Sequence, residues 1–467
     1  MQGEILENIR ALGVLLSDMH KPYMMPAAMA QPDVKIPEPR ISLFVVILCK
    51  LLARLYLFLF YGVARVVLRG EKYLFEAFKR ALEGKSRCII AFRHPNGGEP
   101  QLLAWFFLFK LRRLAARAGV KFPRFPHAVF IYGYEVVRWG GWAVRYVMPN
   151  VGAMPIHHSK VDSKGMARIY KAITDGPYPL ALAPEGQVSY TTESVPRLEQ
   201  GAVRIGFHAA DRLAKSGSDI PIEILPVAVH ARFGPWGKLT LAFLIKKIEK
   251  FTCVGKEAKK LPLSQRFKAS RDHILAVNEK RYHLKSDPEM PFEERLDAVI
   301  DAAMVSAEHI LGVKSEGELF ARMYYLRQIC WDRMILPGVN SLDNLTGVER
   351  GSADLLAGEA WHASRHLEVV DFSWYFRVPL PADDAPLHYV VEYSQNLWDF
   401  ASRTMGGAYA NRISIFPRRV IIQAAPVINL TERLPSYHED KKAAIGKAMQ
   451  DLMDSYQYCI DEVNRTE

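Results

Sequence analysis

Short apolar runs alternate with amphipathic stretches in the part of the chain that begins at Arg87. Apolar runs of this length are typical of buried strands. The predicted strands are Cys88–Phe92, Ala128–Tyr132, Ala153–Ile156, Leu180–Ala183 and Ile222–His230. Between them, apolar positions recur at helical spacing in Pro100–Ala118, Ser163–Thr174 and Leu198–Lys215. Strands that alternate with helices of this length predict an α/β fold, in which helices flank a sheet.

The second half of the chain has a different pattern. Residues 261–416 are mostly of helical periodicity and carry many aromatic side chains, with few motif-like features. After them, the apolar run Arg419–Pro426 predicts one more strand, and Lys441–Val463 predicts a final helix. We therefore expect a largely helical C-terminal region, followed by a strand and a helix that complete the α/β domain.

The most apolar part of the chain, Ile41–Val67, precedes the first predicted strand. Lys50 and Arg54 interrupt it, so it is a poor candidate for a spanning helix, which needs about 20 predominantly apolar residues. At about 100° per residue, Lys50, Arg54 and Arg65 fall within an arc of roughly 60°. One narrow cationic stripe on an apolar helix favours a helix that lies in a membrane interface. The alternative is a core helix that buries its apolar face.

These patterns divide the chain into four ranges. Residues 1–84 are expected to form an N-terminal tail and membrane-interface helices, and residues 85–255 to form the α/β domain. Residues 256–415 would form the helical region, and residues 416–467 would supply the last strand and helix.

Composition narrows the class of protein. With 467 residues, 49% of them hydrophobic, the chain is not disordered overall, and a mean hydropathy of −0.04 excludes a polytopic membrane protein. The net charge of +11 predicts an anionic partner, which is either nucleic acid or an acidic membrane surface. The five cysteines lie far apart, without zinc-ligand or CxxC spacing, so a reducing cytosolic environment is expected.

A candidate catalytic loop follows the first predicted strand directly, with the sequence Arg93-His94-Pro95-Asn96-Gly97-Gly98-Glu99-Pro100. In a regular helix His94 and Glu99 would point about 140° apart. The Pro-Asn-Gly-Gly segment must turn, however, and can fold His94 back towards Glu99. A carboxylate that holds one imidazole nitrogen makes the other nitrogen a better general base. The alternative is a helix-capping loop with an incidental histidine. A second pair at this spacing, His366 and Asp371, lacks a Gly-rich loop and is not expected to be catalytic.

Four further motifs follow in order: Gly152-Ala153-Met154-Pro155-Ile156, Ala183-Pro184-Glu185-Gly186-Gln187, Gly201-Ala202-Val203-Arg204-Ile205-Gly206 and Leu225-Pro226-Val227. With the His94 loop, they resemble the glycerolipid acyltransferase superfamily, which includes the glycerol-3-phosphate and lysophosphatidic acid acyltransferases. That family's pattern is His-x4-Asp after a first strand, a Gly-x-Ile-Pro-Ile-type strand, Phe-Pro-Glu-Gly-Thr-Arg, Lys-x-Gly and a closing Val-Pro-Val. The resemblance covers roughly residues 65–232 and implies a mixed sheet flanked by helices.

The resemblance implies an O-acyltransferase that moves a fatty acyl group from acyl-CoA or acyl carrier protein to a hydroxyl of a glycerolipid-type acceptor. His94 would be the general base, Glu99 would orient it, and backbone N–H groups would stabilise the oxyanion. The expected substrate-binding residues are Arg93, Asn96, Gly97, Gly98, His157, His158, Pro184, Glu185, Gly186 and Gln187. The acyl chain would enter a groove lined partly by Leu102, Leu103, Phe106 and Phe107; the alternative for these residues, expected for at least half of them, is packing in the core. This chemistry implies no metal and no organic cofactor.

The departures from the family pattern concern cations that typically surround the acceptor phosphate. Gln187 and Val188 stand where the family has Thr-Arg, and Gln200 stands where it has Lys. His157 and His158 stand where the second motif often ends in Asp-Arg. Bidentate recognition of phosphate by arginine is hard to replace with these residues. Either other cations substitute, or the acceptor carries no phosphomonoester there, which is the interpretation we favour. The candidate substitutes are Arg93, Arg197, Arg204, His157 and His158.

The expected partners are therefore an acyl thioester, a lipid acceptor and a membrane surface, with the protein monotopic on the cytoplasmic face. Nucleic acid is not expected, because the chain has no zinc spacing, RNP-like motif or obvious helix-turn-helix signature. Lysines at 246–260, beside Phe243 and Phe251, form either a solvated helical face or a contact with anionic lipid head groups. Two other functions stay open: a sugar-lipid acyltransferase, and a catalytically weak membrane lipid-binding protein of the same fold.

Overall fold

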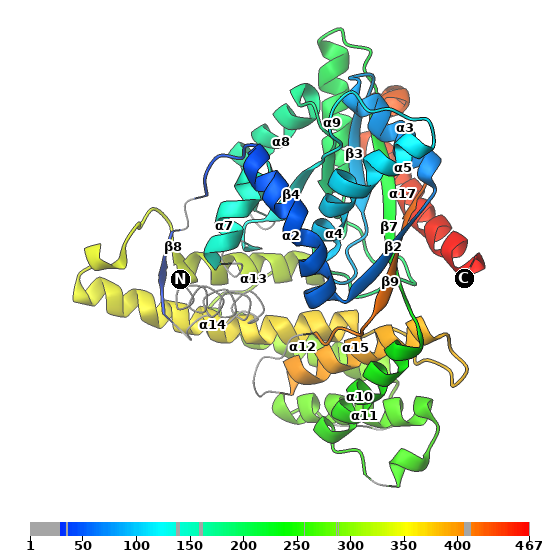
Figure 1. The fold of residues 1–467 in the computed structure, drawn as a ribbon. Helices are drawn as coiled ribbons and strands as arrows, with labels where there is room; N and C mark the ends of the chain where they lie inside the picture. The colour runs from blue at the N-terminus through cyan, green and yellow to red at the C-terminus, as the bar shows by residue number, and fades with distance from the viewer. Residues whose placement is uncertain are drawn as a thin grey trace, which may run out of the picture.

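The computed structural model describes residues 29–33, 36–136, 141–157, 162–255, 257–285, 287, 289–405 and 412–466. The N-terminal tail up to residue 28 and the expected site residue His158 lie outside these ranges. The described chain forms a sheet covered by helices, with a second group of helices below it in the view of Figure 1.

Within the described residues, eight strands form one mixed sheet, which confirms the predicted α/β class. Its order is β2-β9-β7-β3-β6-β4-β5, and the short β10 pairs with β7. β3 is parallel to β6 and β7, and β4 is parallel to β5 and β6, whereas β9 runs antiparallel to β7. The bounds are β2 Val63–Arg69, β3 Arg87–Phe92, β4 Val129–Gly133, β5 Met154–Ile156, β6 Leu180–Leu182, β7 Ile222–Phe233, β9 Arg418–Ala424 and β10 Ile428–Asn429.

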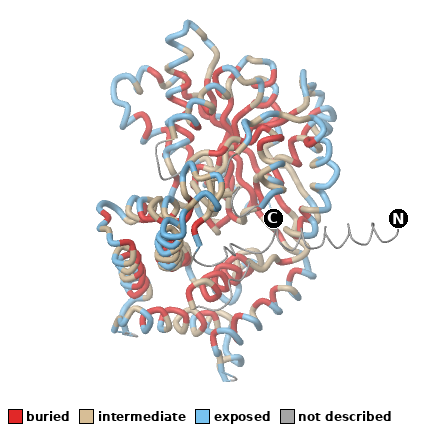
Figure 2. The backbone as a smooth tube through the Cα atoms, turned by 90° about the vertical axis from the view of Figure 1, so that its left-hand side faces the viewer, coloured by how far each residue is buried: buried red, intermediate tan, exposed pale blue. Residues whose placement is uncertain are grey.

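Helices cover both faces of this sheet because each strand alternates its side chains between two separate cores. On β3, Ile90 and Phe92 belong to one core, and Ile89 and Ala91 belong to the other. The first core is closed by α3 Glu71–Leu82, α4 Glu99–Phe106, the π-helical η1 Phe107–Leu111 and α5 Arg112–Arg117. The second is closed by α8 Ser163–Asp175, α9 Gly201–Lys215, α16 Leu434–Glu439 and α17 Lys441–Arg465. Figure 2 shows the buried strands between these layers.

The helical region packs around its own core, which is built mainly from α10 to α15. Its longest helix, α14, begins with a capping box between Thr346 and Glu349. The bounds are α10 Pro235–Phe251, η2 Ala258–Lys260, α11 Leu263–Arg281, α12 Phe292–Leu311, α13 Leu319–Met334, η3 Leu342–Asn344, α14 Gly347–Tyr375 and α15 Leu387–Thr404. A small pair of parallel strands, β1 Gln31–Pro32 and β8 Ile335–Leu336, joins the N-terminal segment to it.

The expected single helix over Ile41–Val67 is wrong in its second part. α2 spans Leu43–Tyr61, and Gly62 ends it at a φ of 65°, in the left-handed region that glycine adopts without strain. The β-branched residues that follow form β2, which pairs with β9 in the sheet. Arg65 therefore lies on a strand and cannot continue the stripe of Lys50 and Arg54. Residues 1–84 also supply a strand and, in α3, a helix of the α/β layers.

The prediction that four apolar residues of the helix after the His94 loop line an acyl-chain groove is also wrong, and the alternative of core packing is confirmed. Leu102, Leu103, Phe106 and Phe107 are all buried in the core between the sheet and the helices on its first face. They pack against strand residues such as Phe92 and do not line a groove.

Candidate active site

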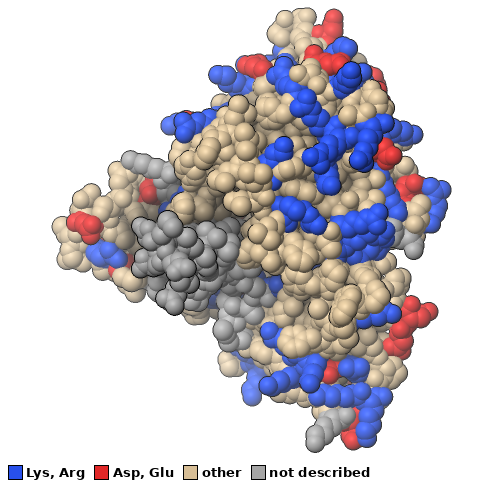
Figure 3. Space-filling view, in the orientation of Figure 1, with Lys and Arg blue, Asp and Glu red and all other residues tan. Residues whose placement is uncertain are grey.

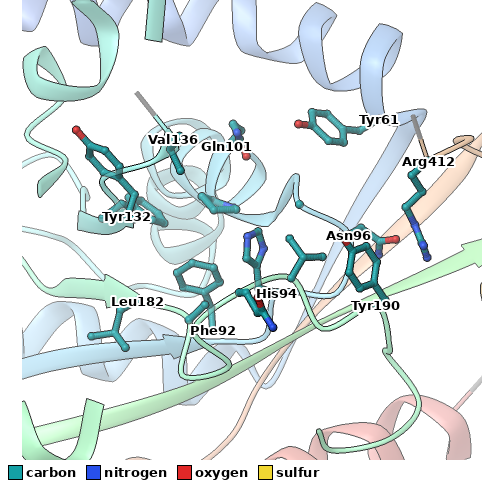
Figure 4. A pocket seen from close by; sticks show the side chains of 18 of the residues that line it. Tyr61, Phe92, His94, Asn96, Gln101, Tyr132, Val136, Leu182, Tyr190 and Arg412 are labelled. Carbon is teal, nitrogen blue, oxygen red and sulfur yellow. The ribbon is translucent and has the colours of Figure 1, made fainter. Parts of the chain in front are cut away.

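His94 and Glu99 meet, as the turn between them allows. His94 follows β3, the strand between β6 and β7, and Glu99 is the first residue of α4. Their side chains form a hydrogen bond of 2.8 Å between Nδ1 of His94 and Oε2 of Glu99. Figure 4 shows the His94 imidazole projecting into a cavity, on the side where Gln101 and Tyr61 lie.

Two glycines allow this loop to turn. Gly97 has a φ of 85°, which strains any residue with a side chain. Gly98 lies against the ring of Tyr61, so closely that a Cβ atom there would come within 2.6 Å of the ring. The backbone N–H of Asn96 also donates to Oε2 of Glu99, at 3.2 Å. The local sequence thus pulls the loop back over the start of α4.

The environment of Glu99 fixes its charge. Burial works to raise the pKa of the Glu99 carboxyl, but the hydrogen bond from His94 and the charges of His94 and Arg418 outweigh it. The pKa of Glu99 therefore lies below its ordinary value, and the carboxylate accepts the proton of Nδ1. This arrangement leaves the lone pair of the His94 Nε2 atom available in the neutral imidazole.

Arg93 and Glu185, both expected to bind substrate, instead form a buried ion pair. Arg93 donates from Nε to Oε1 of Glu185 at 2.5 Å, and from Nη2 to the carbonyls of Thr191 and Ser194. Oε2 of Glu185 accepts from the backbone N–H of His94 at 2.5 Å. Neither side chain lines the cavity. The pair holds the end of β3 against the loop after β6. It therefore supports the backbone of His94, the candidate base, and does not face the cavity.

The other expected residues divide into two groups. Asn96, Gly97, Pro184, Gly186, Gln187 and His157 line the cavity, whereas Gly98 does not. His157 follows β5, and its ring stacks on Tyr134 with 4.3 Å between the ring centroids. Gln187 is held by the helical region, because its amide donates to the hydroxyl of Tyr375 and accepts from Nη1 of Arg327 at 3.2 Å.

The cavity has a volume of about 1150 Å³ and lies where the α/β layers meet the helical region. The wall on the side of the sheet comes from residues at the carboxyl ends of β3, β4, β5 and β6. Parallel sheets commonly bind ligands at this edge. The other walls of the cavity come from α2, from the helical region and from the segment before β9. The helical region contributes Tyr324, Asp371, Phe372, Tyr375, His388, Val391, Glu392, Gln395 and Arg403.

Three arginines that the sequence interpretation did not select line this cavity: Arg403, Arg412 and Arg418. Arg412 pairs with the buried Asp399, and its guanidinium lies 5.2 Å from the Tyr190 ring centroid. In the described part of the chain, the Nε atoms of Arg412 and Arg418 are buried without a hydrogen-bond partner. By contrast, the side chains of Arg197 and Arg204 do not line the cavity: Arg197 pairs with Glu199, which itself lines the cavity, and Arg204 donates to Gln200 at an exposed position.

These arginines lie more than 300 positions after His94 and belong to no recognised motif, which explains why they were missed. The one feature of the sequence that could have pointed to them is that they precede the predicted last strand, Arg419–Pro426. The pair His366 and Asp371 is not a second site, because His366 bonds to the Tyr282 hydroxyl at 2.9 Å and Asp371 pairs with Arg327.

Comparison of the chain with protein-family models and with curated proteins found no match. The resemblance therefore rests on the motif residues alone. Among the described residues, no cluster of His, Cys, Asp and Glu side chains could hold a metal ion, and all five cysteines are free thiols.

Proposed function

We propose that the protein is an O-acyltransferase of the glycerolipid type, with His94 as general base and Glu99 as the residue that orients it. The observation that carries this proposal is the 2.8 Å bond between Nδ1 of His94 and Glu99, with the His94 side chain on the wall of a strand-end cavity. An imidazole held at one nitrogen, with the other facing a cavity large enough for a lipid, fits a base that deprotonates a bound hydroxyl.

In the proposed step, Nε2 of His94 takes the proton of the acceptor hydroxyl as its oxygen attacks the thioester carbonyl. The tetrahedral oxyanion then collapses, the carbon–sulfur bond breaks, and the thiolate leaves with the proton from the imidazolium. Glu99 stabilises the transient charge on His94 and stays ionised, consistent with its lowered pKa. The products are an ester and a free thiol, so the step requires no further reactant.

The acceptor in this proposal carries an anionic group. Arg412 and Arg418 place buried guanidinium groups on the cavity wall, and guanidinium forks suit phosphate oxygens. They offer the cationic surface that the motif positions Gln187, Val188 and Gln200 lack. This favours a phosphate-bearing acceptor, in place of the phosphate-free one that the motif departures suggested.

The proposal locates the protein on the cytoplasmic face of a membrane, with α2 as an interfacial helix. α2 is long and apolar enough to cross a bilayer by length and composition, and only 17% of its most apolar window is buried. However, Val45, Val46 and Leu57 pack into the protein, and Gly62 turns the chain straight into the sheet. A helix fixed at one face and at its end fits the surface of a bilayer better than its interior.

An acyl-transfer assay tests this function. The purified protein is mixed with one labelled acyl-CoA and, in separate reactions, with lysophosphatidic acid, glycerol-3-phosphate, monoacylglycerol and a lysoglycolipid. We expect labelled phosphatidic acid or lysophosphatidic acid as the main product. Transfer mainly to the lysoglycolipid would instead support a sugar-lipid acyltransferase, and no transfer to any acceptor would support a lipid-binding protein without this activity.

A further inference from the structure

The exposed face of α10 is apolar in its first half. Trp236, Leu239 and Phe243 are 69%, 62% and 66% exposed, which is unusual for large apolar side chains this close together. At about 100° per residue, the three fall within an arc of about 60°. The opposite side of the helix is buried, since Leu241, Leu244 and Ile248 pack into the core of the helical region. α10 thus has one face in the protein and one apolar face in solvent.

The charges on α10 are all of one sign at its surface. Lys238, Lys246, Lys247 and Lys250 are exposed. The only acidic residue in this helix, Glu249, is buried and bonded to Nε of Arg266 at 2.7 Å. An exposed face with aromatic and aliphatic side chains, followed by lysines and no acid, is complementary to a lipid interface that bears anionic head groups.

α10 and α2 meet at one short segment, although they are far apart in the sequence. Oγ1 of Thr240 donates to the carbonyl of Phe416 at 3.3 Å, and Oγ of Ser414 donates to the carbonyl of Phe60 at 3.4 Å. The segment from Ser414 to Phe416 therefore joins the start of α10 to the end of α2. On the face shown in Figure 3, Lys and Arg side chains gather above and below a band of other residues.

The cavity reaches this same part of the surface. Leu59, in the last turn of α2, lines the cavity and is also 51% exposed, so the cavity opens at the apolar face of α2. Phe416, beside the start of α10, lines the cavity as well, as does Phe233, two residues before that helix. An apolar mouth between two exposed apolar helix faces is suited to a lipid that enters from the side.

We propose that α10 is a second lipid-docking helix, which with α2 seats the protein on an anionic phospholipid bilayer so that the cavity mouth at Leu59 faces the lipid. The bilayer surface is the occupant that matches both the apolar side chains and the unbalanced lysines. The proposal does not rest on the chemistry of His94, because it concerns only the surface around the mouth.

Vesicle sedimentation with the full-length chain tests the proposal. The probes are phosphatidylcholine vesicles with and without about 30 mol % phosphatidylserine. The triple variant Trp236→Ser, Leu239→Ser, Phe243→Ser should bind both kinds of vesicle at least about tenfold more weakly than the unchanged protein. The variant Lys246→Glu, Lys250→Glu should lose mainly the preference for phosphatidylserine, at about fivefold per lysine.

The matched control is Val348→Ser, Leu355→Ser, which removes equally exposed apolar side chains from α14, in a different part of the surface. This control variant should bind vesicles as strongly as the unchanged protein. All the variants should have the same melting temperature as the unchanged protein. Unchanged vesicle binding by the α10 triple variant would overturn the proposal. So would sedimentation velocity showing that this face joins two copies of the chain, with the triple variant monomeric and still bound to vesicles. His94→Ala should bind vesicles as strongly as the unchanged protein. Failure of the proposed acyl transfer can therefore be distinguished from failure of the proposed membrane docking.

Discussion

At the scale of single residues, Glu185 changes its expected role most. The resemblance implied that it shapes the acceptor pocket, yet its two oxygens face inward, to Arg93 and to the backbone N–H of His94. A buried carboxylate with these partners positions the loop that carries the base, rather than the substrate. Its effect on catalysis would then pass through the position of His94.

Replacing Glu185 should therefore destabilise the whole protein. Glu185→Ala leaves the Arg93 guanidinium buried without its counter-charge, which typically costs about 3–5 kcal/mol. Urea denaturation monitored by circular dichroism measures this change. The control is Lys215→Ala, which breaks the exposed pair with Asp211 and should cost at most about 1 kcal/mol. Equal stabilities of the two variants would show that the buried pair does not hold the loop.

Arg412 is the residue that best tests the proposed acceptor. Removing one charged hydrogen-bond donor to a phosphate should raise KM about 10- to 100-fold. For Arg412→Gln we expect this rise with lysophosphatidic acid and little change with monoacylglycerol, which has no phosphate. Arg204→Gln, at an exposed position outside the cavity, should change neither value. An equal rise with both acceptors would mean that Arg412 supports the fold, through Asp399, and not phosphate recognition.

At the scale of elements, the apolar runs predicted the central strands well, because buried parallel strands are continuous apolar segments. The run over Ile41–Val67 misled because helix and strand adjoin within one apolar stretch. The signal that separates them is Gly62, followed by the β-branched pair Val66 and Val67. Contacts across long separations, such as β2 with β9, follow from no local pattern and needed the structure.

The outer face of α2 should carry a large share of membrane binding. Leu51→Ser, Leu55→Ser changes two exposed side chains one turn apart and should weaken vesicle binding at least about tenfold. The melting temperature should not change, because neither side chain is buried. The control, Val305→Ser on α12, removes an exposed apolar side chain elsewhere. These substitutions test α2 more specifically than a truncation near Glu71 would, because the truncation would also remove β2 from the sheet. If the Leu51→Ser, Leu55→Ser variant binds vesicles as strongly as the unchanged chain, the proposed role of α2 is contradicted.

At the scale of the whole molecule, the helical region completes the candidate site. The resemblance covered only the α/β part, and the sequence did not decide whether the helical region, residues 261–415, shapes access for the acceptor or binds a partner. In the structure, Tyr375 and Arg327 hold Gln187, and side chains from α13, α14 and α15 form cavity walls. The pairing of His94 with Glu99 was predictable from a short loop. The arginines of the cavity wall were not, because the fold brings them there from the far end of the chain.

The most direct test of this account is the rate of acyl transfer by His94→Ala, measured on vesicles that contain the acceptor, with one labelled acyl-CoA. Loss of a positioned general base should slow transfer about 10²- to 10⁴-fold, with vesicle binding and melting temperature unchanged. His366→Ala, whose histidine has the same spacing to an acid but lies outside the cavity, should transfer at the normal rate. A normal rate for His94→Ala would contradict the proposed role of His94 and with it the assignment of the site.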